Sequence, residues 1–159
     1  MVQIEQYGPY GSQLPETFRM QLAEGEHISG CSVRHGYIVD AIAFVVTKHD
    51  GSTYTVQFGG NGGDETDIKL VAGEYLTRLS GTYGNYADQN NEVLIGKLKI
   101  HTNLNPAGYG PYGQGRDLID AQTFHSPDLT DGPIVGIFGR NNNYLDSIGI
   151  FVRTEFPSA

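Results

Sequence analysis

The sequence predicts an all-β domain in which three similar units share one core, and three observations lead to this prediction. The chain of 159 residues contains 22 Gly and 10 Tyr but no Trp, a composition that favours strands and tight turns over helices. Gly-rich turns recur at a constant interval, and each interval contains a segment of alternating apolar residues. We expect a single domain over residues 1–159, because a chain of this length typically builds one core.

Three Gly-rich turns divide the chain into repeats. They are Gly8–Gly11, Gly59–Gly63 and Gly110–Gly113, and their first residues are 51 positions apart in both intervals. The first and third turns have the same residues, Gly-Pro-Tyr-Gly. The spacing predicts three repeats of about 51 residues.

Each repeat contains one strongly alternating segment about halfway along. These segments are Ala41–Val46, Ile95–Ile100 and Ser147–Val152, and their period of two predicts strands. After Asp50-Gly51 the first strand is followed by another at Ser52–Phe58, which predicts a hairpin. No segment of 11 or more residues has helical periodicity; residues 70–79 come nearest, but Gly73 interrupts them.

Three small β-units cannot each bury a core of their own. The arrangement that lets them share one is three antiparallel sheets around a pseudo-threefold axis, each with an apolar face turned inward. The Gly-rich turns are then expected to gather at one end of the molecule.

The charge and the cysteine content exclude several classes of partner. A net charge of −8 without a basic cluster argues against nucleic acid, and no apolar run approaches the roughly 18 residues that span a membrane. Cys31 is the only cysteine, so an intrachain disulfide is impossible and a reducing compartment is expected. The N-terminal residues lack the pattern of a signal peptide, so we expect a cytoplasmic or otherwise leaderless soluble protein.

Two aspartates stand at equivalent places, directly at the start of a predicted strand. Asp40 follows Gly36 by four residues, and Asp146 follows Asn142 by the same interval. Such a turn can direct backbone N–H groups and one carboxylate to a common point, a combination that suits the adjacent hydroxyls of a sugar. The alternative is that each aspartate only caps its turn, and position within the repeat is what singles out these two.

Other chemistries have weaker support in the sequence. Asp64, Glu65 and Asp67 are the densest acidic group, but they lie in a polar segment where solvent keeps them ionised, so we expect no catalysis. The five His residues are scattered without ligand spacing, so we expect no metal site. A series of tyrosines is expected mainly to pack in the core and turns: Tyr10, Tyr54, Tyr83 and Tyr112.

Several segments together resemble jacalin-related lectins, in order and over nearly the whole chain. The segments are Phe58–Gly63, Gly73–Thr77, Ser80–Gly84, Tyr109–Gly113, Ile134–Arg140 and Tyr144–Gly149. The resemblance implies a β-prism of three four-stranded antiparallel sheets. It also implies reversible sugar binding without catalysis, metal or cofactor, and the pairing of two chains into a dimer.

The resemblance also implies two carbohydrate-binding sites. The C-terminal site consists of Asn143, Tyr144 and Asp146, facing the first turn near Gly11 and Ser12. The second site, present in some mannose-binding members, consists of Tyr37, Ile38 and Asp40, facing Gly62 and Gly63. In the middle repeat the position of the acid is Gly96, so no third site is expected.

The sugar class and the ranking of the sites follow from how this chain differs from the family pattern. Galactose-preferring members require a chain cut that frees an N-terminal Gly, and this chain continues from Met1, so mannose/glucose-type glycans or glycoproteins are the expected partners. A galactose-type lectin and a protein-interaction module without sugar binding are the alternatives. The first turn carries Leu14 and Pro15 in place of a Gly-rich run, so we expect the Asp40 site to bind at least as strongly as the Asp146 site. Asn142 in place of the leading Gly is expected to be tolerated because Asn adopts left-handed backbone angles readily.

Overall fold

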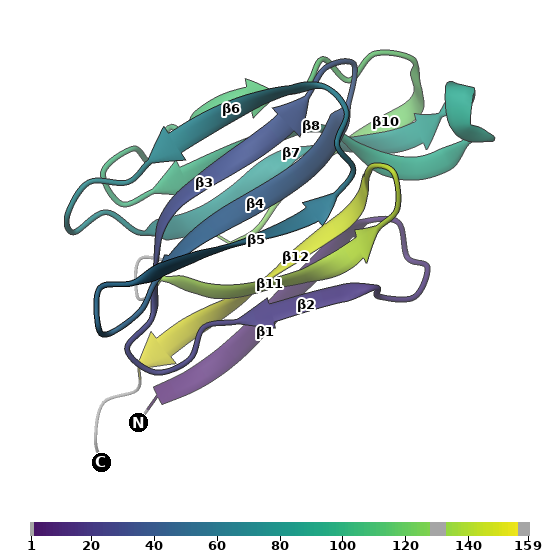
Figure 1. The fold of residues 1–159 in the computed structure, drawn as a ribbon. Helices are drawn as coiled ribbons and strands as arrows, with labels where there is room; N and C mark the ends of the chain where they lie inside the picture. Colours follow the sequence, from purple (N-terminus) through teal and green to yellow (C-terminus); the bar gives the residue numbers. More distant parts are fainter. Residues whose placement is uncertain (1, 128–132, 156–159) are drawn as a thin grey trace.

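The computed structural model describes residues 2–127 and 133–155 and has three four-stranded antiparallel sheets (Figure 1). The first sheet has the order β1 (Val2–Gly11), β12 (Leu145–Glu155), β11 (Ile134–Asn141), β2 (Phe18–Gln21). The second has the order β5 (Thr53–Gly59), β4 (Val39–Thr47), β3 (His27–His35), β6 (Asp64–Lys69). The third has the order β10 (Leu118–His125), β7 (Leu76–Tyr86), β8 (Glu92–Thr102), β9 (Tyr109–Tyr112). The predicted all-β fold class and the three sheets are confirmed.

The three sheets have one topology. At the centre of each is a hairpin of consecutive strands, β3–β4, β7–β8 or β11–β12, and two further strands flank it. In the first sheet the flanking strands β1 and β2 come from the other end of the chain, so Gln3 pairs with Thr154. The pairing of β1 with β12 joins the two ends of the described chain in one sheet (Figure 1).

The core lies between the three sheets, and every sheet contributes to it. In β4 the large alternate residues Ile42 and Phe44 belong to the core cluster, and the small residues Ala41 and Ala43 beside them are buried as well. Ile95 and Leu98 of β8 and Ile148 of β12 have no exposed surface and belong to the same cluster. Burial of this shared apolar surface is the main force that holds the sheets together.

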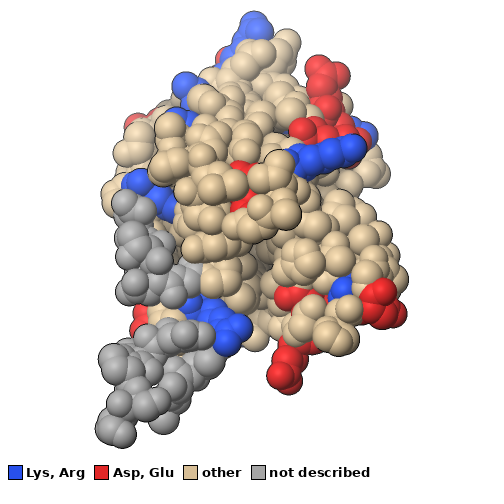
Figure 2. All heavy atoms as spheres, turned by 90° about the vertical axis from the view of Figure 1, so that its left-hand side faces the viewer, with Lys and Arg blue, Asp and Glu red and all other residues tan. Residues whose placement is uncertain are grey.

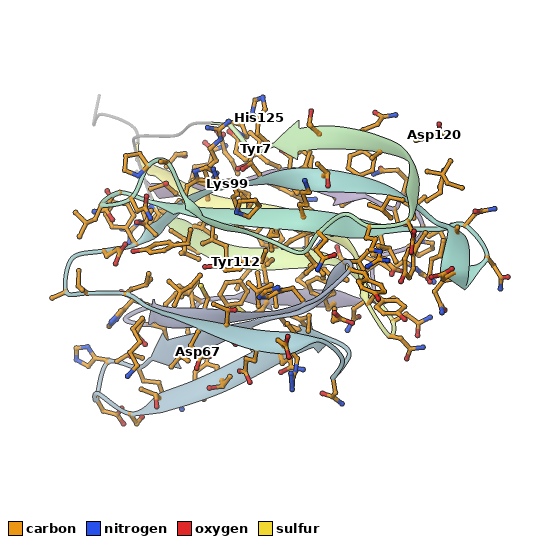
Figure 3. All side chains as sticks on the ribbon, turned by 90° about the horizontal axis from the view of Figure 1, so that it is seen from above. Tyr7, Asp67, Lys99, Tyr112, Asp120 and His125 are labelled. Atoms are coloured by element: carbon orange, nitrogen blue, oxygen red, sulfur yellow. The ribbon has the colours of Figure 1, made fainter. Side chains whose placement is uncertain are left out.

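Aromatic contacts join the sheets in pairs along their edges. Tyr10 stacks on Phe124 with ring centroids 5.1 Å apart, and Phe18 stacks on Phe58 at 4.4 Å. The rings of His35 and Tyr112 are 5.2 Å apart, and Tyr112 lies between the sheets in the middle of the molecule (Figure 3). Two of the tyrosines expected to pack internally therefore link one sheet to the next.

Helical structure is minimal in the described chain, as the sequence predicts. The one short 3-10 helix is η1 (Ala87–Gln89), in the turn between β7 and β8. Residues 70–79 form a loop followed by the start of β7. Within the described ranges, no helix has the length and apolar character needed to cross a membrane.

The prism has two different ends. The turns of the three central hairpins lie at the right-hand end of Figure 1, and the β4–β5 and β6–β7 connections lie at the other end. Figure 2 looks onto that other end, where uncharged residues occupy the centre and charged residues lie mainly around them. The candidate site belongs to the hairpin-turn end.

Candidate functional site

A β-bulge in each central hairpin displays one residue at the hairpin-turn end. In the β3–β4 pair, Arg34 and His35 face Ala41 and Val39, so Asp40 is the extra residue. The same shift makes Asp146 the extra residue of β11–β12 and Gly96 the extra residue of β7–β8. Bulges redirect side chains out of the regular alternation. A β-bulge therefore positions both candidate aspartates. The middle repeat has the same bulge, but Gly96 stands there in place of an acidic residue.

A glycine packs against each bulge at equivalent positions: Gly11, Gly59 and Gly113. A Cβ on them would lie 2.6, 2.3 and 2.3 Å from the carbonyl oxygens of Asp146, Asp40 and Gly96 respectively, and all three have positive φ. No other residue type fits these positions. The equivalence corrects the predicted repeat register, because the spacing is 48 residues from Gly11 to Gly59 and 54 from Gly59 to Gly113 rather than 51 twice.

The turn that contains Gly62 and Gly63 packs directly against the Asp40 carboxylate. A Cβ on Gly62 would lie 2.9 Å from Oδ1 of Asp40, and a Cβ on Gly63 would lie 2.7 Å from Oδ2. Only glycines let this turn pack directly on the carboxylate. The structure thus brings Gly62 and Gly63 to Asp40.

A cavity of about 280 Å³ opens beside Asp40. Its lining includes Tyr37, Ile38, Asp40 and Gly63, together with Tyr86 and Tyr144. Asp40 itself is 7 % exposed, and its burial raises the pKa of the carboxyl, while the positive charges of Arg34 and His35 oppose that rise. The carboxylate is therefore partly shielded but reachable from the cavity.

The Asp146 carboxyl has different surroundings. It is fully buried, with Nε of Arg140 3.6 Å from its Oδ2 and the Glu92 carboxyl of β8 close by. Burial and the nearby Glu92 carboxyl raise the pKa of Asp146 to about 8, and Arg140 opposes the rise. Neither carboxyl oxygen of Asp146 has a hydrogen-bond partner among the described groups.

The first turn packs against the backbone of Asp146. The Ser12 N–H donates to the Asp146 carbonyl at 3.0 Å, as Gly60 N–H does to the Asp40 carbonyl at 3.0 Å. Nη1 of Arg140 also donates to the Pro15 carbonyl at 2.9 Å, which ties the turn to the Asp146 side. Gly11 and Ser12 therefore lie against Asp146 through its backbone, while its carboxyl is covered.

The remaining predicted residues, Asn143 and Tyr144, connect the two sites. A Cβ on Gly60 would lie 2.1 Å from the Asn143 carbonyl oxygen, so the Gly-rich turn packs on the β11–β12 turn. Tyr144 lines the Asp40 cavity and makes an edge contact with Tyr86 at 5.8 Å. Tyr144, predicted for the Asp146 site, thus contributes its side chain to the Asp40 site.

The reason predicted for the tolerance of Asn142 in place of Gly, a left-handed backbone conformation, was wrong. Asn142 N–H donates to the Tyr144 carbonyl at 3.0 Å, just as Gly36 N–H donates to the Ile38 carbonyl at 3.0 Å. Neither Asn142 nor Gly36 is among the described residues with positive φ. Asn replaces Gly here because the backbone is in an ordinary conformation.

Sequence reasoning missed the contribution of the middle repeat. The turn between β7 and β8 is longer than its two counterparts, and this hairpin extends furthest at the right-hand end of Figure 1. Its strand ends bring Tyr86 to the Asp40 cavity and Glu92 to Asp146. The equal spacing of 51 residues between the Gly-rich turns gave no sign of this longer hairpin, because the intervals are unequal only when Gly11, Gly59 and Gly113 are aligned in the structure.

Residues 7–151 match the family model of the jacalin-like lectin domain. The chain belongs to the jacalin-like lectin family. It is 28% identical to the mannose/glucose-specific lectin of Parkia pendula over 96% of this chain and 43% of that protein, so it spans less than half of that relative. It is 37% identical to the jacalin-related lectin Calsepa of Calystegia sepium over 71% of each chain.

Solved structures of jacalin-like lectins have the same fold. Calsepa lectin in complex with a biantennary N-glycan superimposes with a TM-score of 0.77 at 29% identity, covering 98% of each chain. Wild-type Malaysian banana lectin superimposes with a TM-score of 0.73 at 28% identity, covering 94% of this chain and 98% of that one. The three sheets of this jacalin-like lectin are therefore those of the family.

Two residues of the acidic group considered from the sequence, Glu65 and Asp67, line a cavity of about 440 Å³ beside β3 and β6. Asp64, Glu65 and Asp67 all lie exposed on β6, which is an edge strand of the second sheet. Among the residues that the structure describes, no three His, Cys, Asp or Glu side chains are close enough to hold a metal ion.

Proposed function

We propose that this chain binds mannose- or glucose-type glycans reversibly, with the Asp40 cavity as its main site. The observation that carries the proposal is the position of the Asp40 carboxylate, beside an open cavity and against a turn of glycines. A carboxylate accepts hydrogen bonds from two sugar hydroxyls and makes them stronger than neutral bonds. The glycines allow a sugar ring to approach the backbone closely.

The β3–β4 turn supplies donors that complement this acceptor. No described group accepts a hydrogen bond from the N–H of Tyr37 or of Ile38. Backbone N–H groups can donate to the oxygens of a sugar whose hydroxyl hydrogens point to Asp40. With few hydrogen bonds in an exposed site, we expect a monosaccharide dissociation constant of about 1 mM, roughly −4 kcal/mol.

The Asp146 site should be the weaker of the two. Its carboxyl is fully buried, and a pKa of about 8 leaves it mostly protonated at neutral pH. A sugar there has to uncover the group and separate it from Glu92, both of which oppose binding. We therefore propose that both sites bind, with the Asp40 site stronger.

The similar proteins support the sugar class. The Parkia pendula lectin is a mannose/glucose-specific lectin, and the Calystegia lectin forms a complex with a biantennary N-glycan. The proposal includes no catalysis. A glycosidase places two carboxyl groups about 5–10 Å apart across the sugar, whereas Asp40 is the one carboxylate in the described lining of its cavity.

Titration of methyl α-mannoside followed by two-dimensional NMR tests this function. We expect Asp40→Ala to lose the shifts of residues 36–40 and 62–63, because the sugar hydroxyls lose their charged acceptor, at a cost of about 2 kcal/mol or more. Asp146→Ala should keep these shifts. Asp40→Asn, which preserves the shape of the side chain, separates loss of charge from loss of packing.

Two results would contradict the proposal. If Asp40→Ala binds like the wild type while Asp146→Ala loses all binding, the main site is at Asp146. If the folded wild-type protein binds no glycan on an array, this chain has the family fold without the sugar-binding function.

A further inference from the structure

An exposed cation stacks on an exposed aromatic ring at the mouth of the Asp40 cavity. Cζ of Arg116 lies 4.4 Å from the centroid of the Tyr37 ring. Tyr37 is 48 % exposed, whereas its neighbours Ile38 and Asp40 are 2 % and 7 % exposed. The pair therefore forms a raised rim beside the cavity.

Backbone hydrogen bonds hold this rim in place. The Arg116 N–H donates to the Tyr37 carbonyl at 2.8 Å, and the Gln114 N–H donates to the Gly36 carbonyl at 3.0 Å. These bonds attach the β9–β10 loop of the third sheet to the β3–β4 turn of the second sheet. The stack is thus preorganised, and a ligand would lose little entropy in ordering it.

The fold does not require these two side chains for its own stability. Arg116 forms no ion pair with any described carboxylate, and its guanidinium is exposed. An exposed cation–π contact contributes only a small stabilisation. The Tyr37 ring and the N–H donors of Arg116 are therefore available to a ligand next to the cavity, which is large enough for a sugar.

We propose that Tyr37 and Arg116 form a second sugar subsite, which makes the Asp40 site selective for mannose disaccharides over the monosaccharide. This inference rests on the function proposed above. The apolar C–H face of a pyranose packs on an aromatic ring, and the guanidinium donates to hydroxyl oxygens of the same sugar. Asp40 is an acceptor for the first sugar, and Arg116 is a donor for the second.

The position of the pair decides which sugar it contacts. With the first ring in the cavity at Asp40, Tyr37 is the lining side chain with the largest surface available for a second ring, because it lines the cavity and is 48 % exposed. A neutral sugar is favoured over an acidic one, because the net charge of −8 repels anions from the surface as a whole.

Calorimetric titration of methyl α-mannoside and of α-linked mannobioses tests this inference. We expect at least one mannobiose to bind the wild type about fivefold to tenfold more tightly than the monosaccharide, as a stacking contact and a charge-assisted hydrogen bond would provide. Arg116→Gln should lose most of this advantage and bind the monosaccharide as the wild type does. Arg116→Lys should keep only part of it, because the ammonium lacks the planar set of donors.

Lys48→Gln is the matched control. Nζ of Lys48 lies 5.5 Å from the centroid of the Tyr54 ring, so this variant removes a similar cation–π contact, in the β4–β5 region at the other end of the prism. It should retain the full preference for the disaccharide. All variants are first compared with the wild type by NMR to establish that they fold.

The outcomes separate this inference from the proposed function. If the wild type binds methyl α-mannoside but no mannobiose more tightly, the subsite does not exist while the function stands. The same holds if Arg116→Gln keeps the preference or weakens both ligands in equal proportion. If the wild type binds neither sugar, the proposed function fails and the subsite fails with it.

Discussion

The two candidate aspartates differ at the scale of single residues, although the backbone presents them in the same way. Asp40 meets the glycines of its facing turn and the positive charges of Arg34 and His35. Asp146 is instead fully buried beside the Glu92 carboxyl. A buried carboxyl beside another carboxyl favours its neutral form. The same residue type at equivalent positions therefore has different electrostatic surroundings.

This difference predicts how stability depends on pH. The pKa of Asp146 rises from 3.8 to about 8 in the folded protein, so the folded state holds the proton more tightly than the unfolded state. The resulting stabilisation is fully present below pH 3.8 and is lost as pH rises through about 8. Asp146→Asn cannot ionise, so its melting temperature relative to the wild type should rise steadily from pH 4 to pH 9.

Differential scanning calorimetry over this pH range checks the expectation. Asp67→Asn, at an exposed position on β6, is the control for removing one carboxylate. A difference between Asp146→Asn and the wild type that stays constant with pH would show that Asp146 does not hold its proton in this way.

At the scale of the element, the central hairpins depend on glycines where strands approach closely. Gly81 of β7 pairs with Leu98 of β8, and a Cβ there would lie 1.9 Å from the Lys97 carbonyl oxygen. Real Cβ atoms do not approach a backbone oxygen so closely, so the two strands would have to separate. Gly36 offers a contrast, because the nearest atom to a Cβ there is 4.0 Å away.

We therefore expect Gly81→Ala to destabilise the protein by about 2–4 kcal/mol through overpacking of backbone against backbone. Gly36→Ala should change stability by less than about 1 kcal/mol. Urea denaturation followed by circular dichroism measures both values. Equal effects of the two variants would mean that the β7–β8 pair adjusts its spacing more readily than the close contact implies.

At the scale of the whole molecule, the three sheets depend on one another through the shared core. Leu98 has no exposed surface and belongs to the cluster that includes Ile42 of the second sheet and Ile148 of the first. None of the sheets has a second apolar layer of its own to pack against. The prism is therefore expected to unfold as one unit.

Leu98→Ala should reduce the free energy of unfolding by about 2–5 kcal/mol, because it removes buried contacts and leaves a cavity. Leu104→Ala removes a leucine side chain that is 59 % exposed and should change stability by less than about 0.5 kcal/mol. Thermal unfolding monitored by tyrosine fluorescence and by circular dichroism measures both variants. A melting curve with two separate transitions would contradict the single shared core.

Glycan binding should also be independent of metal ions. The described residues contain no cluster of ligands for a metal, and the proposed contacts are those of one carboxylate and backbone N–H groups. Isothermal titration of mannose before and after dialysis against EDTA should give the same dissociation constant. Loss of binding after dialysis, restored by adding calcium, would show that a metal completes the site.

The sequence by itself determined the features that depend on local pattern. Period-two alternation and Gly-rich turns predicted the strands, the three units and the end at which the turns gather. The position of Asp40 and Asp146 at strand starts also followed from the repeats, whereas Gly96 at the equivalent place in the middle repeat came from the family resemblance. The prediction that Gly62 and Gly63 face Asp40 came from the family resemblance.

Only the tertiary structure decided which groups meet across the repeats. A bulge exists only relative to a partner strand, so neither the extra residue at Asp40 nor the true equivalence of Gly11, Gly59 and Gly113 can be derived from one strand. The charge state of Asp146 depends on Glu92, which is 54 residues away in sequence. Tyr144 reaches the Asp40 cavity from the first sheet, and Arg116 of the third sheet reaches the Tyr37 ring that lines it. Contacts of this kind depend on distance in space, and a pattern in the sequence records only distance along the chain.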